Sequence, residues 1–202
     1  MGMSTGKSPN ILRVGDISHL SKYLPSLQHL LQRCVNDDPA TSSIGFLAPL
    51  SDQDAMDHWL DLQTSITGPR PENMLLVATL DNGNGDSDMH VNRNGDNSAA
   101  VIATVVIARA LKQTHAYKGE IRKLLVHPDF RRDGLGAAMM AEAERVAREE
   151  LGLELFVLDT AMDTPARRFY LKMGRTEWGL CPDYAMDAAG LKYECSFFFK
   201  RL

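Results

Sequence analysis

The chain has 202 residues, of which 44% are hydrophobic and 24% are charged, ordinary values for one globular domain with a substantial core. Its net charge of -4 at pH 7 argues against a nucleic-acid binder, and no apolar run reaches the roughly 18 residues of a membrane span. The three cysteines are scattered and lack metal-site spacing, so we expect reduced thiols and no metal. The N-terminus lacks a signal-peptide pattern, so we expect a cytoplasmic protein.

The N-terminal region predicts a tail, a strand and a helix. Residues 1–10 are small and polar, so we expect a flexible tail. Residues 11–17 alternate well enough to predict a first strand. Apolar residues recur at helical spacing over residues 20–34, but Pro25 predicts a break or a new helix start within them.

A second helix and a strand pair follow. Ser51 and Asp54 form a capping pattern, so we expect a helix to begin there. Residues 74–80 and 100–110 are β-rich apolar runs, which we expect to pair as antiparallel strands. Between them, residues 81–98 are dominated by Asn, Gly, Asp and Ser, so we expect a mobile insertion that lacks apolar anchors.

The C-terminal half predicts a strand–helix–strand unit, a further helix and a closing strand. Residues 120–126 and 155–159 are predicted strands on either side of a helix over residues 134–151, which makes a βαβ unit with a right-handed crossover. A helix over residues 164–173 follows, and residues 193–200 are predicted to close the sheet.

The turn that opens the helix of the βαβ unit carries a phosphate-binding pattern. A helix start leaves backbone N–H groups unpaired, and Gly134 and Gly136 let that backbone approach a phosphate closely. Arg131 and Arg132 add charge-assisted contacts. No Lys-Ser/Thr follows as in a Walker loop, and Met139 stands where a dinucleotide fingerprint needs its third glycine. The turn therefore predicts a pyrophosphate site of another kind.

These residues resemble the Arg-x-x-Gly-x-Gly loop of the GNAT superfamily of N-acetyltransferases, which holds the pyrophosphate of acetyl-coenzyme A. Ala166 and Tyr170 are similar to residues of the family's helix after the fifth strand, whose tyrosine lies near the thioester. Asp133 departs from the pattern by placing a carboxylate in the loop, and we expect it to point outward. The resemblance implies that acetyl-coenzyme A contacts Leu125, Val126, Arg131, Arg132, Asp133, Gly134, Leu135, Gly136, Ala137, Ala166 and Tyr170.

The resemblance also implies the fold. We expect a single α/β (α+β) domain over residues 11–202, with a mixed, mostly antiparallel sheet and helices on both faces. Four short segments further resemble the tabtoxin-resistance type of acetyltransferase, namely residues 45–50, 123–128, 158–160 and 181–185. This closer resemblance implies a small, polar, amino-acid-like amine as acceptor, in a pocket lined by Phe46, Trp59, Asp159 and Tyr184. Core packing is an equally good explanation of Phe46 and Trp59.

Acetyl transfer to an amine requires an uncharged nitrogen, so a substrate ammonium must lose a proton to a base. Glu120 and Asp159 are carboxylates on predicted strands, where such residues are uncommon, and Glu120 matches a position that often supplies the base in the superfamily. Alternatively, Glu120 solvates a strand start and Asp159 caps a turn. A backbone N–H near Val126 is expected to stabilise the thioester oxyanion. The resemblance assigns the proton for the leaving thiolate to Tyr170, with ordinary helix packing as the alternative.

The sequence therefore predicts an acetyl-coenzyme A-dependent N-acetyltransferase. Direct transfer is favoured because no cysteine is placed beside a histidine and an acid as a nucleophile. The alternatives are an enzyme that acetylates protein lysines or N-termini, and a catalytically silent acyl-coenzyme A sensor. We expect a small-molecule amine as substrate, no nucleic-acid or membrane partner, and a monomer or homodimer.

Overall fold

The computed structural model describes residues 9–37, 45–80 and 100–202, so the predicted insertion and most of the predicted tail lie outside it. A seven-stranded sheet with the order β1-β2-β3-β4-β5-β7-β6 forms its centre. The strands are β1 (Asn10–Val14), β2 (Asn73–Thr79), β3 (Val101–Arg109), β4 (Lys118–Val126), β5 (Leu155–Ala161), β6 (Thr176–Met186) and β7 (Lys192–Arg201).

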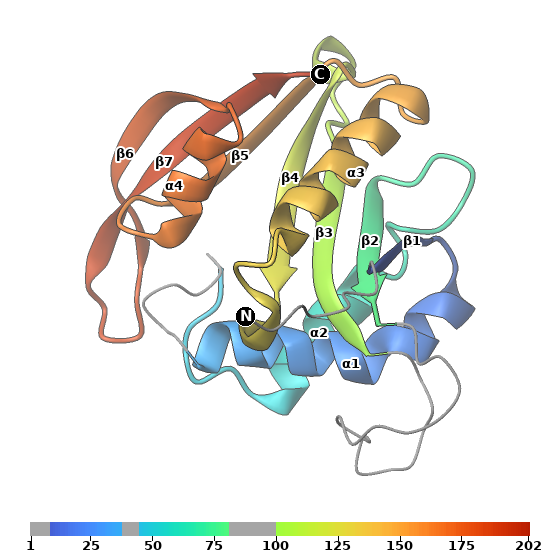
Figure 1. Cartoon of the computed structure of the whole chain (residues 1–202), viewed down its shortest axis with the longest axis horizontal. Helices are drawn as coiled ribbons and strands as arrows, with labels where there is room; N and C mark the ends of the chain where they lie inside the picture. The colour runs from blue at the N-terminus through green and yellow to red at the C-terminus, as the bar shows by residue number, and fades with distance from the viewer. Residues whose placement is uncertain (1–8, 38–44, 81–99) are drawn as a thin grey trace, which may run out of the picture.

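The strands β4 and β5 are parallel, whereas the other neighbouring pairs in the described part of the sheet are antiparallel. Pairing between β4 and β5 covers only their first residues and stops at Glu120 opposite Val157. Beyond that point the two strands diverge, and Figure 1 shows the resulting opening at the centre of the sheet. The predicted mixed, mostly antiparallel sheet is confirmed.

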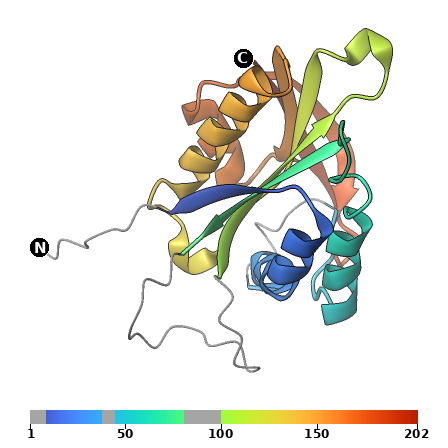
Figure 2. The ribbon, with the colours of Figure 1, turned by 90° about the vertical axis from the view of Figure 1, so that its right-hand side faces the viewer.

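Helices cover both faces of the sheet, as predicted. The helices α3 and α4 lie on one face, and α1 and α2 lie on the opposite face (Figure 2). Each face has its own hydrophobic core, and a fully buried leucine in such a core contributes about 1.5–3 kcal/mol. The helices are α1 (Ile17–Asn36), α2 (Asp52–Asp61), α3 (Leu135–Glu149) and α4 (Pro165–Lys172), with short 3-10 turns η2 (Gln113–His115) and η3 (Pro128–Phe130).

The helix α1 runs without interruption through Pro25, so the predicted break was wrong. A proline inside a helix lacks an N–H donor and costs roughly 3 kcal/mol. Leu20, Leu27 and Leu31 are buried on one side of α1, and their combined burial outweighs that cost. The N-terminus of α1 is capped by Asp16, whose carboxylate accepts a hydrogen bond from a backbone N–H.

The helix α2 begins where the capping pattern predicted. The Ser51 hydroxyl accepts a hydrogen bond from the backbone N–H of Asp54 at 3.1 Å and donates one to the Asp54 carboxylate at 2.6 Å. The same helix places Trp59 in the core.

The strand β6 was missed by the sequence analysis. Pro182 is unusual in a strand, and Asp183 has a positive φ of 54°. The pairing of β6 with β7 shifts register between Cys181 and Ala185. The strand tolerates these features because it lies at the edge of the sheet, where one row of backbone groups needs no partner.

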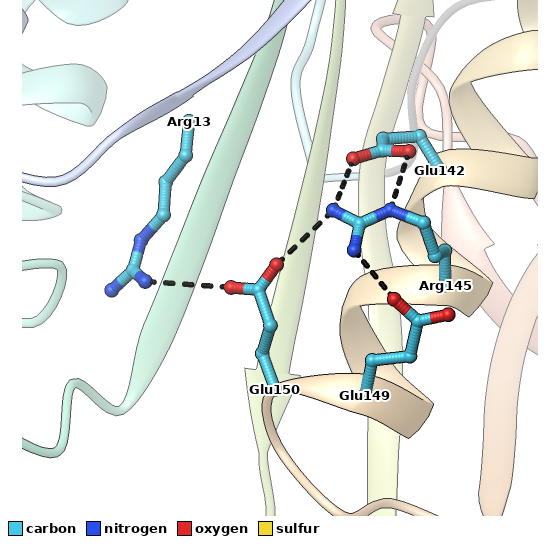
Figure 3. Close-up of polar contacts among 5 residues, drawn as sticks. All are labelled: Arg13, Glu142, Arg145, Glu149 and Glu150. Atoms are coloured by element: carbon cyan, nitrogen blue, oxygen red, sulfur yellow. Dashed lines mark hydrogen bonds and ion pairs between the residues drawn. The ribbon is translucent and has the colours of Figure 1, made fainter.

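An ion-pair network lies at the C-terminal end of α3. Figure 3 shows the guanidinium of Arg145 between Glu142 and Glu149, with Glu150 lying between Arg145 and Arg13. The side chains are partly solvated, so each pair contributes little on its own. No helix in the described residues is long and apolar enough to cross a membrane.

Candidate active site

The predicted phosphate-binding loop lies between β4 and α3. Gly134 is the N-cap residue of α3, with a φ of 82°, and no side chain caps this helix end. The backbone N–H of Ala138 donates to the carbonyl of Gly134 at 3.0 Å, so the N–H groups just before it have no helical acceptor. A Cβ on Gly134 would meet no atom within 4 Å, which shows that the space in front of the helix end is open. The loop therefore fits a phosphate group.

The charged side chains of the loop have different environments. The Nε atom of Arg131 donates a hydrogen bond to the Val126 carbonyl at 3.1 Å, so this side chain ties the loop to the end of β4. Arg132 is exposed, with a φ of 75°, and Asp133 is also exposed. Of the two arginines, Arg132 is thus the one whose side chain reaches solvent at the helix end.

A bulge in β4 changes which side chains face the opening. The pairing of β3 with β4 shifts register between Thr104 and Val106, and Lys123 has a positive φ of 49°. The Thr104 hydroxyl donates a hydrogen bond to the Lys123 carbonyl at 2.9 Å and holds the bulge. As a consequence Arg122 and Lys123 both lie on the face of the sheet that carries α1 and α2.

The two predicted carboxylates lie on that same face, near the point where β4 and β5 diverge. Glu120 pairs with Val157 across the two strands, and Asp159 follows two residues later on β5. Arg122 donates a 2.6 Å hydrogen bond to the Glu120 carboxylate. Burial and the neighbouring charge of Glu120 raise the pKa of Asp159 above its usual value, while Lys123 and Arg122 oppose that rise.

The Lys123 ammonium is a half-buried cation beside these carboxylates. Its Nζ lies 4.4 Å from the centroid of the Phe46 ring, a favourable cation–π contact. Burial lowers the pKa of Lys123 to about 8, although Asp159 partly opposes this shift. The His58 ring contacts the Phe46 ring edge-on. Burial and the charge of Lys123 lower the pKa of His58 to about 4.

The predicted thiolate partner, Tyr170, is buried on α4. Its ring packs against Phe169 and Phe198, and the Arg175 guanidinium lies 6.0 Å from its centroid. Burial raises the pKa of Tyr170 to about 12, so its hydroxyl keeps its proton throughout the physiological range. Ala166, one turn earlier, packs against the same core.

A pocket of about 490 Å³ opens between three loops, namely the segment before α2, the β5–α4 connection and the β6–β7 connection. We call it the three-loop pocket. Three carboxylates line it, and among the described residues its lining contains no lysine or arginine. Its walls are formed by Phe46, Leu47, Ala48, Ala161, Met162, Asp163, Thr164, Met186, Asp187, Ala188, Ala189, Tyr193 and Glu194.

The four residues predicted to bind the acceptor are not all brought together. Phe46 lines the three-loop pocket, and Asp159 lies on β5 at the opening described above. Trp59 is 0% exposed and packs in the core under α1, so the structure favours core packing for this side chain. Tyr184 is 46% exposed on β6 and contacts the Phe197 ring edge-on.

Two of the three cysteines are buried, and Cys181 on β6 is half-buried. Cys34 is buried and donates a weak hydrogen bond to the Val126 carbonyl, and burial raises its pKa. Burial raises the pKa of Cys195 to about 11. Within residues 9–37, 45–80 and 100–202, no group of three or more His, Cys, Asp or Glu side chains is arranged to hold a metal ion.

Comparison with known proteins identifies the family. The model of the acetyltransferase (GNAT) family matches residues 54–174, more than half of the chain. The chain belongs to this family. It is therefore an acyltransferase, and the matched region includes β4, the phosphate-binding loop, α3 and α4.

Solved structures share this fold. A GNAT acetyltransferase from Streptococcus pneumoniae is 14% identical, with a TM-score of 0.65, and the match covers 96% of this chain and 100% of that one. A putative phosphinothricin N-acetyltransferase is 18% identical, with a TM-score of 0.68 and coverage of 96% and 99%. A putative acetyltransferase from Salmonella typhimurium, solved with its cofactor acetyl-coenzyme A, is 16% identical, with a TM-score of 0.63 and coverage of 97% and 95%.

The position of Lys123 and Arg122 at the site was not predicted from the sequence. Lys123 and Arg122 lie beside the carboxylates because a bulge turns both side chains to one face, and alternation along a strand predicts opposite faces instead. The segment that supplies Phe46 also supplies Leu47 and Ala48 to the pocket wall. The Gly45-to-Leu50 segment was noticed only through its resemblance to one type of acetyltransferase.

Proposed function

We propose that this GNAT enzyme transfers the acetyl group of acetyl-coenzyme A directly to the primary amine of a small, polar, amino-acid-like molecule. The observation that carries the proposal is the arrangement of the phosphate-binding loop and the paired carboxylates around the opening between β4 and β5. Acetyl-coenzyme A supplies the activated acetyl group. The residues of this chain bind its pyrophosphate at the start of α3, orient the thioester in the opening and remove a proton from the amine.

In this proposal Asp159 is the stronger candidate for the general base. Its pKa is raised by burial and by Glu120, so it takes up a proton more readily than an exposed aspartate. The Glu120 carboxylate is held in an ion pair with Arg122. Glu120 then acts mainly by its negative charge, which holds the incoming ammonium near Asp159 and sustains the raised pKa.

Tyr170 acts as a hydrogen-bond donor to the departing thiolate. Its pKa of about 12 lies well above the roughly 8.5 of an ordinary thiol, so complete transfer of its proton to the thiolate is unfavourable by roughly 3.5 pKa units. A hydrogen bond from the phenol stabilises the thiolate without that transfer. The proton that the thiol finally gains therefore comes from a group other than Tyr170. The amine releases a proton in the same reaction.

Direct transfer is supported by the state of the two buried thiols. An acetyl-cysteine intermediate requires a thiolate, and burial raises the pKa of both Cys34 and Cys195. Initial-velocity measurements with varied acetyl-coenzyme A and amine test this step. We expect intersecting double-reciprocal lines and no acetylated enzyme in intact-mass spectra. Parallel lines together with an acetyl-cysteine adduct would contradict direct transfer.

The acceptor is proposed to be small because the three-loop pocket has a limited volume and an acidic lining. A volume of about 490 Å³ suits a compact molecule, and Asp163, Asp187 and Glu194 attract a cationic amine. The same loops could instead receive the end of a peptide, as in an enzyme that acetylates protein N-termini. A ribosomal-protein-S18-alanine N-acetyltransferase from Escherichia coli shares the fold at 15% identity and a TM-score of 0.63. That match covers 96% of this chain and 94% of the other. Competition between small amines and peptides separates these acceptors.

A further inference from the structure

A second pocket lies away from the active site, at the C-terminal end of α3. It has a volume of about 410 Å³, and we call it the arginine pocket. Its three arginines come from separate parts of the chain: Arg13 from β1, Arg70 from the segment before β2 and Arg109 from the end of β3. The whole lining is Arg13, Pro69, Arg70, Pro71, Met74, Arg109, Glu150 and Leu151.

The positive charge of this pocket is poorly neutralised. Glu150 is its one carboxylate, and it lies 3.8 Å from Arg13 but 3.1 Å from Arg145 (Figure 3). Arg145 is also paired with Glu142 and Glu149, so the charge of Glu150 is the one that compensates Arg13. The side chains of Arg70 and Arg109 form no hydrogen bond or ion pair within the described part of the chain. Three cations thus converge on a pocket that contains one compensating carboxylate.

The backbone holds these arginines in place. Pro69 and Pro71 flank Arg70, and proline rings restrict the backbone on both sides of it. Arg109 ends a strand, and its backbone N–H donates to the Glu72 carbonyl at 2.8 Å. Like charges repel one another, so an anion that joins the three guanidinium groups removes an unfavourable interaction. Guanidinium groups bind phosphate oxygens through paired, charge-assisted hydrogen bonds.

We propose that the arginine pocket binds a small molecule carrying adjacent phosphate groups, at a site separate from that of acetyl-coenzyme A. The phosphate-binding loop lies at the first residue of α3 and the pocket just beyond the last, and a helix of 15 residues spans about 22 Å. The proposal does not depend on the identity of the acetyl acceptor.

The site has a structural connection to the catalytic strand. Arg109 pairs with Gly119 across β3 and β4, and the next pair is Ala108 with Glu120. The backbone of Arg109 is therefore one residue pair away from Glu120 along the sheet. We propose binding of phosphate groups at this pocket, and an effect of that binding on turnover is not required.

Calorimetry with inorganic pyrophosphate tests the proposal, using full-length protein saturated with coenzyme A so that the phosphate-binding loop is filled. We expect saturable binding with one site per chain. The double variant Arg70→Gln/Arg109→Gln is expected to weaken it by at least tenfold, with an unchanged melting temperature. Arg148→Gln removes one positive charge from an exposed position of α3 outside the pocket and is expected to leave binding unchanged.

Citrate is the second probe, because it carries several carboxylates in place of phosphates. Tighter binding of pyrophosphate than of citrate supports the phosphate assignment, and the reverse order overturns it. The proposal also fails if pyrophosphate shows no saturable binding in the presence of coenzyme A. It fails equally if the double variant binds as well as the wild type, or if Arg148→Gln weakens binding to the same extent.

Discussion

Arg122 donates a 2.6 Å hydrogen bond to Glu120, two residues earlier on the same strand. This pair gives the two carboxylates at the opening of the sheet different chemical characters. The charge of Glu120 is compensated by its own neighbour, whereas the pKa of Asp159 is raised by burial and by that same Glu120. The two residues are therefore expected to contribute unequally to catalysis.

The first prediction compares Asp159→Asn with Glu120→Gln. Loss of a general base costs roughly 10²–10⁴-fold in turnover, and we expect this loss for Asp159→Asn, partly relieved at high pH where the amine loses its proton unaided. Glu120→Gln is expected to have a smaller effect, because it removes a charge and leaves the base. Steady-state turnover of both variants across the pH range measures the difference. Equal full activity in the two single variants and in the double variant would exclude this pair.

The second prediction concerns the acid side of the pH profile. The base must be unprotonated, so kcat/KM is expected to fall as the pH drops through the raised pKa of Asp159. Lys123 opposes that rise, and Lys123→Met is therefore expected to move the acid limb to higher pH. Lys123→Arg keeps the positive charge and serves as the control. An acid limb at the same pH in the wild type and in Lys123→Met would contradict this electrostatic coupling.

The third prediction concerns stability. The pKa of Lys123 falls from 10.5 to about 8 on folding, so between these values the unfolded chain binds more protons and stability rises with pH. Below pH 8 the half-buried ammonium costs on the order of 3 kcal/mol. Lys123→Met is thus expected to be more stable than the wild type at pH 7, with an advantage that shrinks towards pH 10. Denaturant unfolding at both pH values measures it, and a variant less stable than the wild type at pH 7 would refute the prediction.

The fourth prediction concerns the phosphate-binding loop. A Cβ at Gly136 would lie 3.6 Å from the Phe169 ring and 3.7 Å from Val126, ordinary contacts that alanine can make. Gly136→Ala is therefore expected to retain the fold and to bind acetyl-coenzyme A. The branched side chain of Gly136→Val adds two methyl groups beside the start of α3, and we expect it to abolish binding while the melting temperature changes little. Calorimetry that gives wild-type affinity for Gly136→Val would argue against the loop as the cofactor site.

Much of the fold could be predicted from the sequence because its signals are local. The capping residues Ser51 and Asp54, the glycines of the loop and the apolar runs of β2 and β3 each act over a few residues. The continuity of α1 through Pro25 could not be predicted in this way, since it depends on burial against a distant sheet. The edge strand β6 was missed because its register shift is supported by β7.

The candidate site was predictable in part for the same reason. The loop at Gly134 is a continuous pattern, Glu120 and Asp159 stand out as carboxylates on predicted strands, and the resemblance to the GNAT superfamily added Tyr170. The place of Lys123 beside Asp159 depends on a bulge held by a hydroxyl of another strand, which no local pattern encodes.

The most direct test of the account is a competition experiment with acetyl-coenzyme A labelled in its acetyl group. The enzyme would receive a mixture of small amino-acid-like amines and N-terminal or lysine-containing peptides at equal concentration, and mass spectrometry would follow where the label goes. We predict that it appears mainly on a primary amine of a small molecule, in step with thiol release, and that Asp159→Asn lowers this transfer. Label found predominantly on the peptides, or binding of acetyl-coenzyme A with no transfer to any amine, would contradict the account.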